Sequence, residues 1–143
     1  MSNRTLVICK PDAVERGLVG EILGRFERRG FRIVAAELRQ VDGALASEHY
    51  AEHLGKDFYP QLLEFITRSP VFAFVLEGPA GSWEVVRHMM GKTNSLVAEP
   101  GTVRGDLSLD GRENLIHGSD GPESAMREIA LWFPGLDAGP AAS

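Results

Sequence analysis

Apolar residues in the first part of the chain follow two different periodicities. Residues 5–9 form a short continuous apolar run, which predicts a buried strand. Lys10 stands at the end of that strand, because the proline that follows lacks a backbone N–H and disfavours its continuation. Apolar positions at helical spacing then predict a helix over residues 18–29, with Gly30 as its C-cap. Residues 31–41 alternate apolar and polar positions and predict a second strand.

The middle of the chain is dominated by helical patterns on either side of one strong strand. Residues 44–54 and 58–66 have the spacing of two amphipathic helices. Residues 71–76 are the strongest strand signal of the chain. They are all apolar or aromatic, with Pro70 before them and Gly78-Pro79 after them. A further helix is expected from Ser82, as its cap, to about Met90.

The last part of the chain begins with residues 92–113, which carry little periodicity. This segment is longer than most structureless loops in compact domains, and it has few apolar residues to anchor it. We therefore expect neighbouring copies of the chain to help order it. An apolar pair then leads to His117, and Pro122 is expected in the first turn of a helix lined by Ala125, Ile129 and Trp132. Residues 135–143 resemble a frayed end or a linker.

The order of these elements predicts a fold of the α+β class. Strands and helices alternate in the manner of a split βαβ unit, which is typical of a ferredoxin-like sandwich. We expect a four-stranded antiparallel sheet with helices covering one face. No repeat or composition change divides the chain, so residues 1–143 are predicted to form a single domain.

Composition narrows the class of protein. Of the 143 residues, 43% are hydrophobic and 24% charged, as in ordinary soluble domains. The net charge of −5 argues against a dedicated nucleic-acid surface, which would normally be basic. No apolar run approaches membrane-spanning length, and the first residues do not resemble a signal peptide. The single cysteine cannot form an intrachain disulfide, so we expect a cytoplasmic protein.

Two short motifs suggest chemistry but lack the context that it needs. The triplet at residues 91–93 resembles the end of a P-loop, yet Val86 occupies the position of the required glycine, and the triplet follows a helix. His49 and His53 are four residues apart, as paired metal ligands would be. No third ligand is evident, so two solvated histidines on a helix surface are the favoured interpretation.

Other residues could serve function or structure equally well when taken alone. Lys10, Arg87 and Arg104 could bind phosphate, although scattered surface cations are equally common. Phe58 could stack on a base or belong to the core. Further along, Glu128 could orient an imidazole or be a surface charge on a helix, and His117 alone is more often a polar turn residue than a nucleophile.

Residues 114–120, Asn-Leu-Ile-His-Gly-Ser-Asp, resemble the signature of nucleoside diphosphate kinases. The likeness extends over nearly the whole chain, with the motifs in the family's order and spacing. They are residues 7–12, 16–22, 48–50, 91–94, 100–106, 123–125 and 128–133.

This resemblance implies a ferredoxin-like enzyme that transfers the γ-phosphate of a nucleoside triphosphate such as ATP to a nucleoside diphosphate. It implies a ping-pong mechanism in which His117 carries the phosphate on Nδ1 and Glu128 holds the other ring nitrogen. Tyr50 and Ser119 are implied to line the surroundings of that histidine. The implied nucleotide contacts lie mostly near the phosphates and are Lys10, Arg87, Thr93 and Arg104, with Lys10 also near the ribose. Asn114 is implied to contact a ribose hydroxyl, and Phe58 is the ring on which the base stacks.

The resemblance also implies a cofactor and an assembly. Mg²⁺ is expected to bind mainly through the nucleotide phosphates, because this ion prefers phosphate oxygens and water to an all-protein cage. No protein ligand set for a metal is therefore expected. The family implies a homo-oligomer, with a hexamer favoured over a tetramer, and neither a membrane nor a nucleic acid as partner.

The sequence departs from the usual family pattern at a few positions. Arg112 and Glu113 precede Asn114 where an arginine commonly stands directly before the asparagine, and Glu113 brings a carboxylate near the phosphate site. Leu107 and Gly121 replace a usual phenylalanine and serine.

Parts of the sequence also fit two other functions. One is a catalytically idle ferredoxin-like module that binds partners or nucleic acid, and the other is a metal-dependent hydrolase using His49 and His53. The retention of His117 and the arginines favours the kinase.

Overall fold

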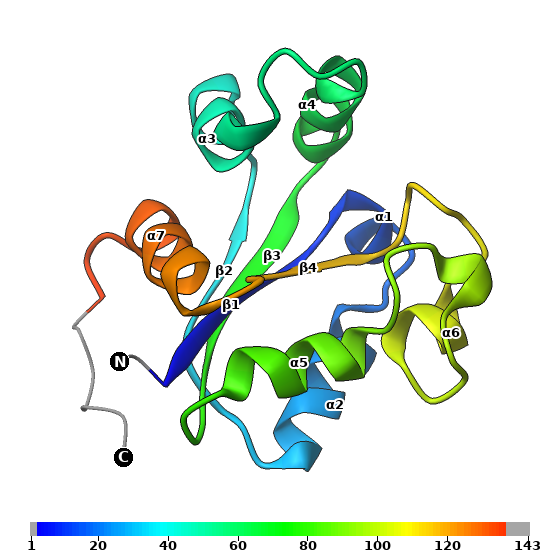
Figure 1. Ribbon diagram of the computed structural model, residues 1–143, viewed down its shortest axis with the longest axis vertical. Coiled ribbons are helices and arrows are strands. Elements are labelled where there is room, and N and C mark those ends of the chain that lie inside the picture. The colour runs from blue at the N-terminus through cyan, green and yellow to red at the C-terminus, as the bar shows by residue number, and fades with distance from the viewer. Residues whose placement is uncertain (1–2, 137–143) are drawn as a thin grey trace.

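The computed structural model describes residues 3–136, which fold around one antiparallel sheet (Figure 1). The sheet has the strand order β2-β3-β1-β4, and each pair of neighbours runs antiparallel. This arrangement confirms the expected α+β fold with a four-stranded antiparallel sheet. The strands are β1 (Arg4–Cys9), β2 (Arg32–Arg39), β3 (Val71–Glu77) and β4 (Ile116–Gly118).

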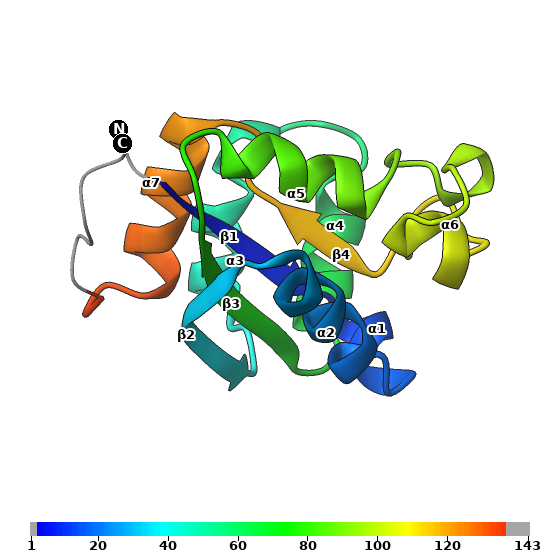
Figure 2. The ribbon, with the colours of Figure 1, turned by 90° about the horizontal axis from the view of Figure 1, so that it is seen from below.

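Helices cover both faces of this sheet, whereas the sequence led us to expect helices on one face. Figures 1 and 2 show α2 and α5 on one side of the strands and α3, α4 and α7 on the other. The helices are α1 (Pro11–Glu15), α2 (Val19–Arg29), α3 (Gly43–His49), α4 (Tyr59–Thr67), α5 (Ser82–Met90), α6 (Val103–Leu107) and α7 (Pro122–Trp132), with short 3₁₀ turns η1 (Ala51–His53) and η2 (Ser95–Val97).

The central strand β1 contributes side chains to two separate hydrophobic cores. Val7 and Cys9 pack under α2 and α5, while Leu6 and Ile8 pack under α3, α4 and α7. All four side chains are fully buried. This follows from the period of two along a strand, which sends successive side chains to opposite faces. A continuous apolar run therefore indicates a strand covered on both sides.

The sequence missed the first helix and misplaced one cap. Pro11 ends β1 but also begins α1, where its missing N–H costs nothing. Ser82 does not cap α5: Gly81 is the N-cap, in a left-handed conformation, and the Ser82 hydroxyl donates to the carbonyl of Pro79. The expected C-cap Gly30 is confirmed, with φ of 110°.

The boundaries of two other predicted segments were wrong. The helix expected over residues 44–54 ends at His49 and is followed by η1. The segment 92–113 is not structureless, because it contains η2 and α6, and Thr102 caps α6 by accepting from the Gly105 N–H. Both views show α6 beyond one end of α5 (Figures 1 and 2). Of the expected linker, residues 137–143 lie outside the described part, and Leu136 packs against the core.

Candidate active site

His117 lies in the middle of β4, where it pairs with Ile8 of the central strand. Its side chain is 25% exposed, so the ring is supported by protein and still reachable from solvent. The Nε2 atom lies 3.1 Å from Oε2 of Glu128 on α7. The helix opens at Pro122, as expected, and carries Glu128 back over the strand.

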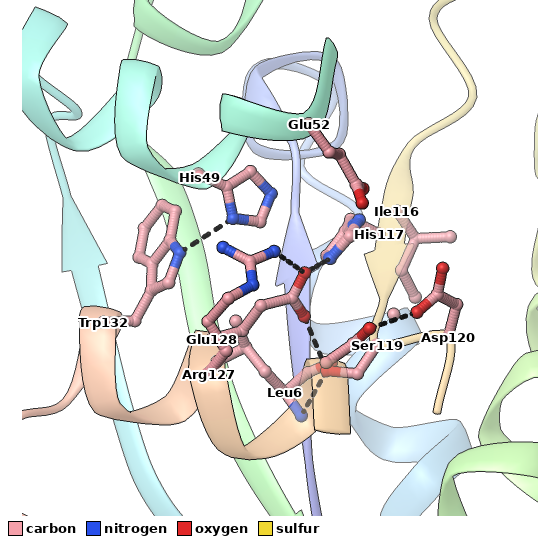
Figure 3. Close-up of polar contacts among 12 residues, drawn as sticks. Leu6, His49, Glu52, Ile116, His117, Ser119, Asp120, Arg127, Glu128 and Trp132 are labelled. Atoms are coloured by element: carbon pink, nitrogen blue, oxygen red, sulfur yellow. Dashed lines mark hydrogen bonds and ion pairs between the residues drawn. The ribbon is translucent and has the colours of Figure 1, made fainter. Parts of the chain in front are cut away.

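Glu128 is a buried carboxylate with several partners (Figure 3). The hydroxyl of Ser119 donates to its Oε1 at 2.6 Å, and the Arg127 guanidinium lies 3.8 Å from its Oε2. Burial alone would raise the pKa of this carboxyl group. The hydrogen bond and charge of His117, together with Ser119, outweigh burial and lower the pKa to about 2. Glu128 is therefore ionised at neutral pH and accepts a hydrogen bond from the Nε2–H of His117, which leaves the lone pair on Nδ1.

His49 packs against His117 with a centroid separation of 4.7 Å and an edge-to-face geometry. It is only 3% exposed, so the expectation of two solvated histidines is wrong for this residue. Its Nδ1 accepts a hydrogen bond from the indole N–H of Trp132 at 3.1 Å. Burial, followed by the charge on His117, lowers the pKa of His49 to about 3, so its ring is neutral. His53 lies in η1, outside the helix that carries His49, and its ring packs near Phe58.

Arg104 is fixed by backbone carbonyls of its own chain. Its Nε donates to Asn114 at 3.1 Å, its Nη1 to Gly91 at 3.0 Å and its Nη2 to Ile116 at 2.6 Å. The residue is 5% exposed, and burial, followed by the charge of Arg87, lowers its pKa to about 10. Arg104 is therefore held by its own chain, although it lies in the segment 92–113 that neighbouring copies were expected to help order.

Two further cations converge on the backbone and side chains around β4. Arg87 on α5 donates from Nη1 to the carbonyl of Gly118 at 3.1 Å. Lys10 donates to the Oδ1 of Asn114 at 2.8 Å, and the Asn114 amide donates to the carbonyl of Thr93 at 2.8 Å. Burial, followed by the charge of Arg104, lowers the pKa of Lys10 to about 8.

A cavity of about 560 Å³ opens beside these residues. Its walls include four of the residues that the sequence marked as nucleotide contacts. Phe58 stands at this cavity with 46% of its surface exposed, which leaves a ring available for stacking. The four residues are Lys10, Phe58, Thr93 and Asn114.

Comparisons with known proteins agree with this geometry. The family model of nucleoside diphosphate kinase matches residues 3–137. The chain belongs to the nucleoside diphosphate kinase family. It is therefore a phosphotransferase. A Nocardioides relative named nucleoside diphosphate kinase is 60% identical over 136 residues, covering 95% of this chain and 100% of the relative. A Mycobacterium leprae relative of the same name is 58% identical over 137 residues, with the same coverage.

Solved structures of other nucleoside diphosphate kinases share the fold. The Halobacterium salinarum enzyme in complex with CDP has a TM-score of 0.89 and 48% identity, covering 93% of this chain and 88% of the other. The structure of the Borrelia burgdorferi enzyme, described as a transition state mimic with bound vanadate and ADP, has a TM-score of 0.87 and 39% identity. The match covers 98% of this chain and 92% of the other.

The unusual glutamate of this kinase is paired with a cation. Glu113 lies 3.1 Å from Arg68, which also contacts Glu15 at 2.7 Å. These groups are partly exposed, and Arg68 and Glu113 are among the residues that line the cavity. The carboxylate that the sequence placed near the phosphates is therefore at least partly neutralised by a neighbour.

Sequence reasoning missed the contribution of Trp132 to this kinase site. The residue was expected only as part of the apolar face of the last helix, and it is indeed 1% exposed. Its indole N–H nevertheless needs a partner when buried, and His49 supplies it. A buried tryptophan is therefore a signal that an acceptor lies nearby, but the sequence does not indicate which residue accepts.

Proposed function

We propose that His117 carries the phosphate in this kinase, through Nδ1. The observation that supports this assignment is the hydrogen bond between its Nε2 and Glu128, whose other oxygen is held by Ser119. An ionised carboxylate fixes the tautomer with hydrogen on Nε2 and directs the lone pair of Nδ1 away from it. Glu128 and Ser119 thus leave Nδ1 as the nitrogen that faces the phosphate.

The reaction proceeds in two matched halves. The Nδ1 lone pair of His117 attacks the γ-phosphorus, a new N–P bond forms, and the bond from phosphorus to the bridging oxygen breaks as the nucleoside diphosphate leaves. The phosphorylated ring gains positive character, which the carboxylate of Glu128 stabilises. An oxygen of the second nucleoside diphosphate then attacks the phosphorus, and the N–P electron pair returns to His117. This order gives ping-pong kinetics.

The remaining residues align and neutralise the phosphates. Phosphoryl transfer depends mainly on positioning and on charge stabilisation. Arg87, Lys10 and Arg104 supply positive charge around β4, and Arg104 is held in place by three carbonyls. We assign Asn114 to the ribose, Thr93 to the phosphates and Phe58 to the base. The CDP and ADP complexes of the two structural relatives support a nucleotide in this cavity.

Mg²⁺ is proposed to arrive with the nucleotide. The described residues around the phosphate site are mainly cations and amides, which suit phosphate and do not form a magnesium cage. This donor set fits an ion held by phosphate oxygens and water. When bound, such an ion neutralises phosphate charge, while the protein groups orient the reacting atoms.

The organisation of the chain is also part of the proposal. Residues 1–143 act as one domain, since both cores share the sheet and the family match spans residues 3–137. We favour a cytoplasmic homohexamer over a tetramer. Exposed apolar side chains on the segment 92–113 support association, namely Leu96 at 65%, Val97 at 57% and Leu109 at 87%. No helix within residues 3–136 has the length and apolarity to cross a membrane.

The variant His117→Ala tests the carrier assignment. We expect it to fold and to bind ADP, because the cavity walls are unchanged, yet to form no acid-labile phosphoenzyme from ATP and no GTP from GDP. The matched control is His88→Ala, which removes an exposed histidine on α5 and should keep both activities. Normal exchange by purified His117→Ala would contradict the assignment, and inactive wild type would favour the idle module.

A further inference from the structure

His49, His117 and Glu128 form a compact cluster that the transfer reaction does not require as a unit. One ligand atom of each lies within 4.8 Å of the others, and Nε2 of His117 is 3.1 Å from Oε2 of Glu128. Their side chains come from α3, β4 and α7 and converge on one region (Figure 3). Two imidazoles and one carboxylate are a common ligand set for zinc.

We propose that this cluster is a latent site for a transition-metal ion of the Zn²⁺ class, and that the Trp132 N–H limits its affinity. Zinc with bonds of about 2.0–2.2 Å holds tetrahedral ligand atoms roughly 3.3–3.6 Å apart. The His117–Glu128 pair is already near that spacing, and His49 is close enough to complete it by small side-chain rotations. Solvent reaches the cluster at His117, so water can supply a fourth ligand.

The hydrogen bond from Trp132 opposes ligation by His49. The indole N–H occupies the lone pair of Nδ1, and the neutral ring therefore carries its own hydrogen on Nε2. Neither nitrogen offers a free lone pair while this bond persists. A metal must break the bond or displace a proton, and the Arg127 guanidinium near Glu128 adds a repulsive charge. Arg127 is 45% exposed and can turn to solvent, whereas Trp132 is buried and fixed.

In the proposed mechanism, a metal ion bound at this site prevents phosphorylation of His117. Coordination at Nε2 displaces the hydrogen that Glu128 holds there, and a ring that stays neutral carries that hydrogen on Nδ1. The lone pair that attacks phosphorus is then lost. Linkage requires the converse as well, so phosphorylation should weaken metal binding by the same factor. This consequence depends on the proposed role of His117, whereas metal binding by the cluster does not.

Titration calorimetry with ZnCl₂ in excess Mg²⁺ tests the site directly. The wild type should bind one Zn²⁺ per chain, and His49→Gln and Glu128→Gln should each bind it at least about tenfold more weakly, since each loses a ligand. His88→Gln is the matched control and should bind as the wild type does. Trp132→Phe should bind about fivefold more tightly, because a typical hydrogen bond of about 1 kcal/mol no longer has to be broken.

The outcomes separate the parts of the proposal. Zinc binding unchanged in His49→Gln would overturn the site, even if Trp132→Phe fails to fold. Equal affinity of folded Trp132→Phe and wild type would overturn the role of the indole. Zinc that binds equally to phosphorylated and unphosphorylated enzyme would overturn the competition. If zinc binds as expected but His117→Ala keeps its exchange activity, the proposed phosphate carrier fails while the metal site stands.

Discussion

At the scale of single residues, the site depends on which nitrogen of each histidine carries hydrogen. Glu128 sets this for His117, and Trp132 sets it for His49. Both partners lie on α7, four residues apart and therefore on the same side of the helix. One face of one helix thus fixes the tautomers of two imidazoles that come from other elements.

The first prediction concerns the acid side of the stability curve. The pKa of His49 is lowered to about 3 in the folded state, against an ordinary value near 6.5 in the unfolded chain. Below pH 6.5 the unfolded state binds a proton that the folded state does not, so stability falls as pH falls through this range. Between pH 7.5 and 5.5, protonation of this residue in the unfolded state should lower the free energy of unfolding of the wild type by about 1.4 kcal/mol.

The variant His49→Gln isolates this effect, because glutamine does not titrate there. Urea unfolding at the two pH values should show a smaller loss in the variant than in the wild type, by about the same 1.4 kcal/mol. Equal losses in the two proteins would mean that His49 titrates normally in the folded state. The control His88→Gln replaces an exposed histidine and leaves His49 in place, so it should keep the loss seen in the wild type.

The second prediction concerns the base. Phe58 offers the face of an aromatic ring, and every base has a face to stack on it, so discrimination should be weak. We expect kcat/KM values for GDP, CDP and UDP to lie within about a hundredfold of each other, which corresponds to nearly 3 kcal/mol. Phe58→Leu should lower all three by a similar factor. A much larger spread in the wild type would require base-edge contacts that this assignment lacks.

At the scale of elements, α6 shows how a short helix places one important side chain. The helix is capped by Thr102, whose hydroxyl accepts from the Gly105 N–H at 3.0 Å and donates to the Glu99 carbonyl at 2.6 Å. Only glycine fits at position 105, since a Cβ there would lie 1.9 Å from the backbone oxygen of Glu99. These contacts fix the turn from which Arg104 reaches the backbone around β4.

The third prediction compares two helix caps. Thr102→Val removes the cap of α6 and should cost about 1 kcal/mol of stability together with a marked loss of phosphoryl transfer. Asp42→Ala removes the cap of α3, where Asp42 accepts from Leu45 N–H at 2.8 Å, and should cost a similar amount. Because α3 does not hold Arg104, activity at matched stability should persist in Asp42→Ala. Equal losses of activity would show that α6 has no special role.

Elements with a clear period were predictable from the sequence, and elements fixed by distant partners were not. The strand at 71–76 and the helix ending at Gly30 were confirmed because local pattern and local caps determine them. The segment 92–113 has no such period: α6 depends on hydrogen bonds within a turn, and Arg104 depends on carbonyls of other segments. The family resemblance named Arg104 as a phosphate contact. It did not show that backbone carbonyls of other residues in the same chain hold the guanidinium.

At the scale of the whole molecule, association is the remaining prediction. Pro100→Gly should loosen the segment 92–113 by enlarging the freedom of the unfolded chain. Arg104 is held within its own chain, so each intact site should keep its chemistry. The exposed apolar residues of the segment should nevertheless lose part of their packing between copies, and the hexamer should dissociate or melt more readily.

Light scattering and thermal melts over a range of protein concentrations check this assembly. The wild type should scatter as a hexamer, and its melting temperature should rise with concentration. A fully active wild-type monomer, with a melting temperature independent of concentration, would contradict the prediction. A stable tetramer would contradict the preference for six copies but not the need for association.

The position of β1 also has a consequence for the order in which a growing chain can become active. The ribosome makes this central strand first, yet its partners β3 and β4 follow much later, and the hydroxyl of Ser119 meets the Leu6 N–H across 113 residues. At typical synthesis rates that separation lasts on the order of 10 seconds. During this interval the apolar residues of β1 have no strand on the β4 side, and the nucleophile does not yet exist. A nascent chain can therefore bury its first strand only in part before it acquires the means to accept phosphate.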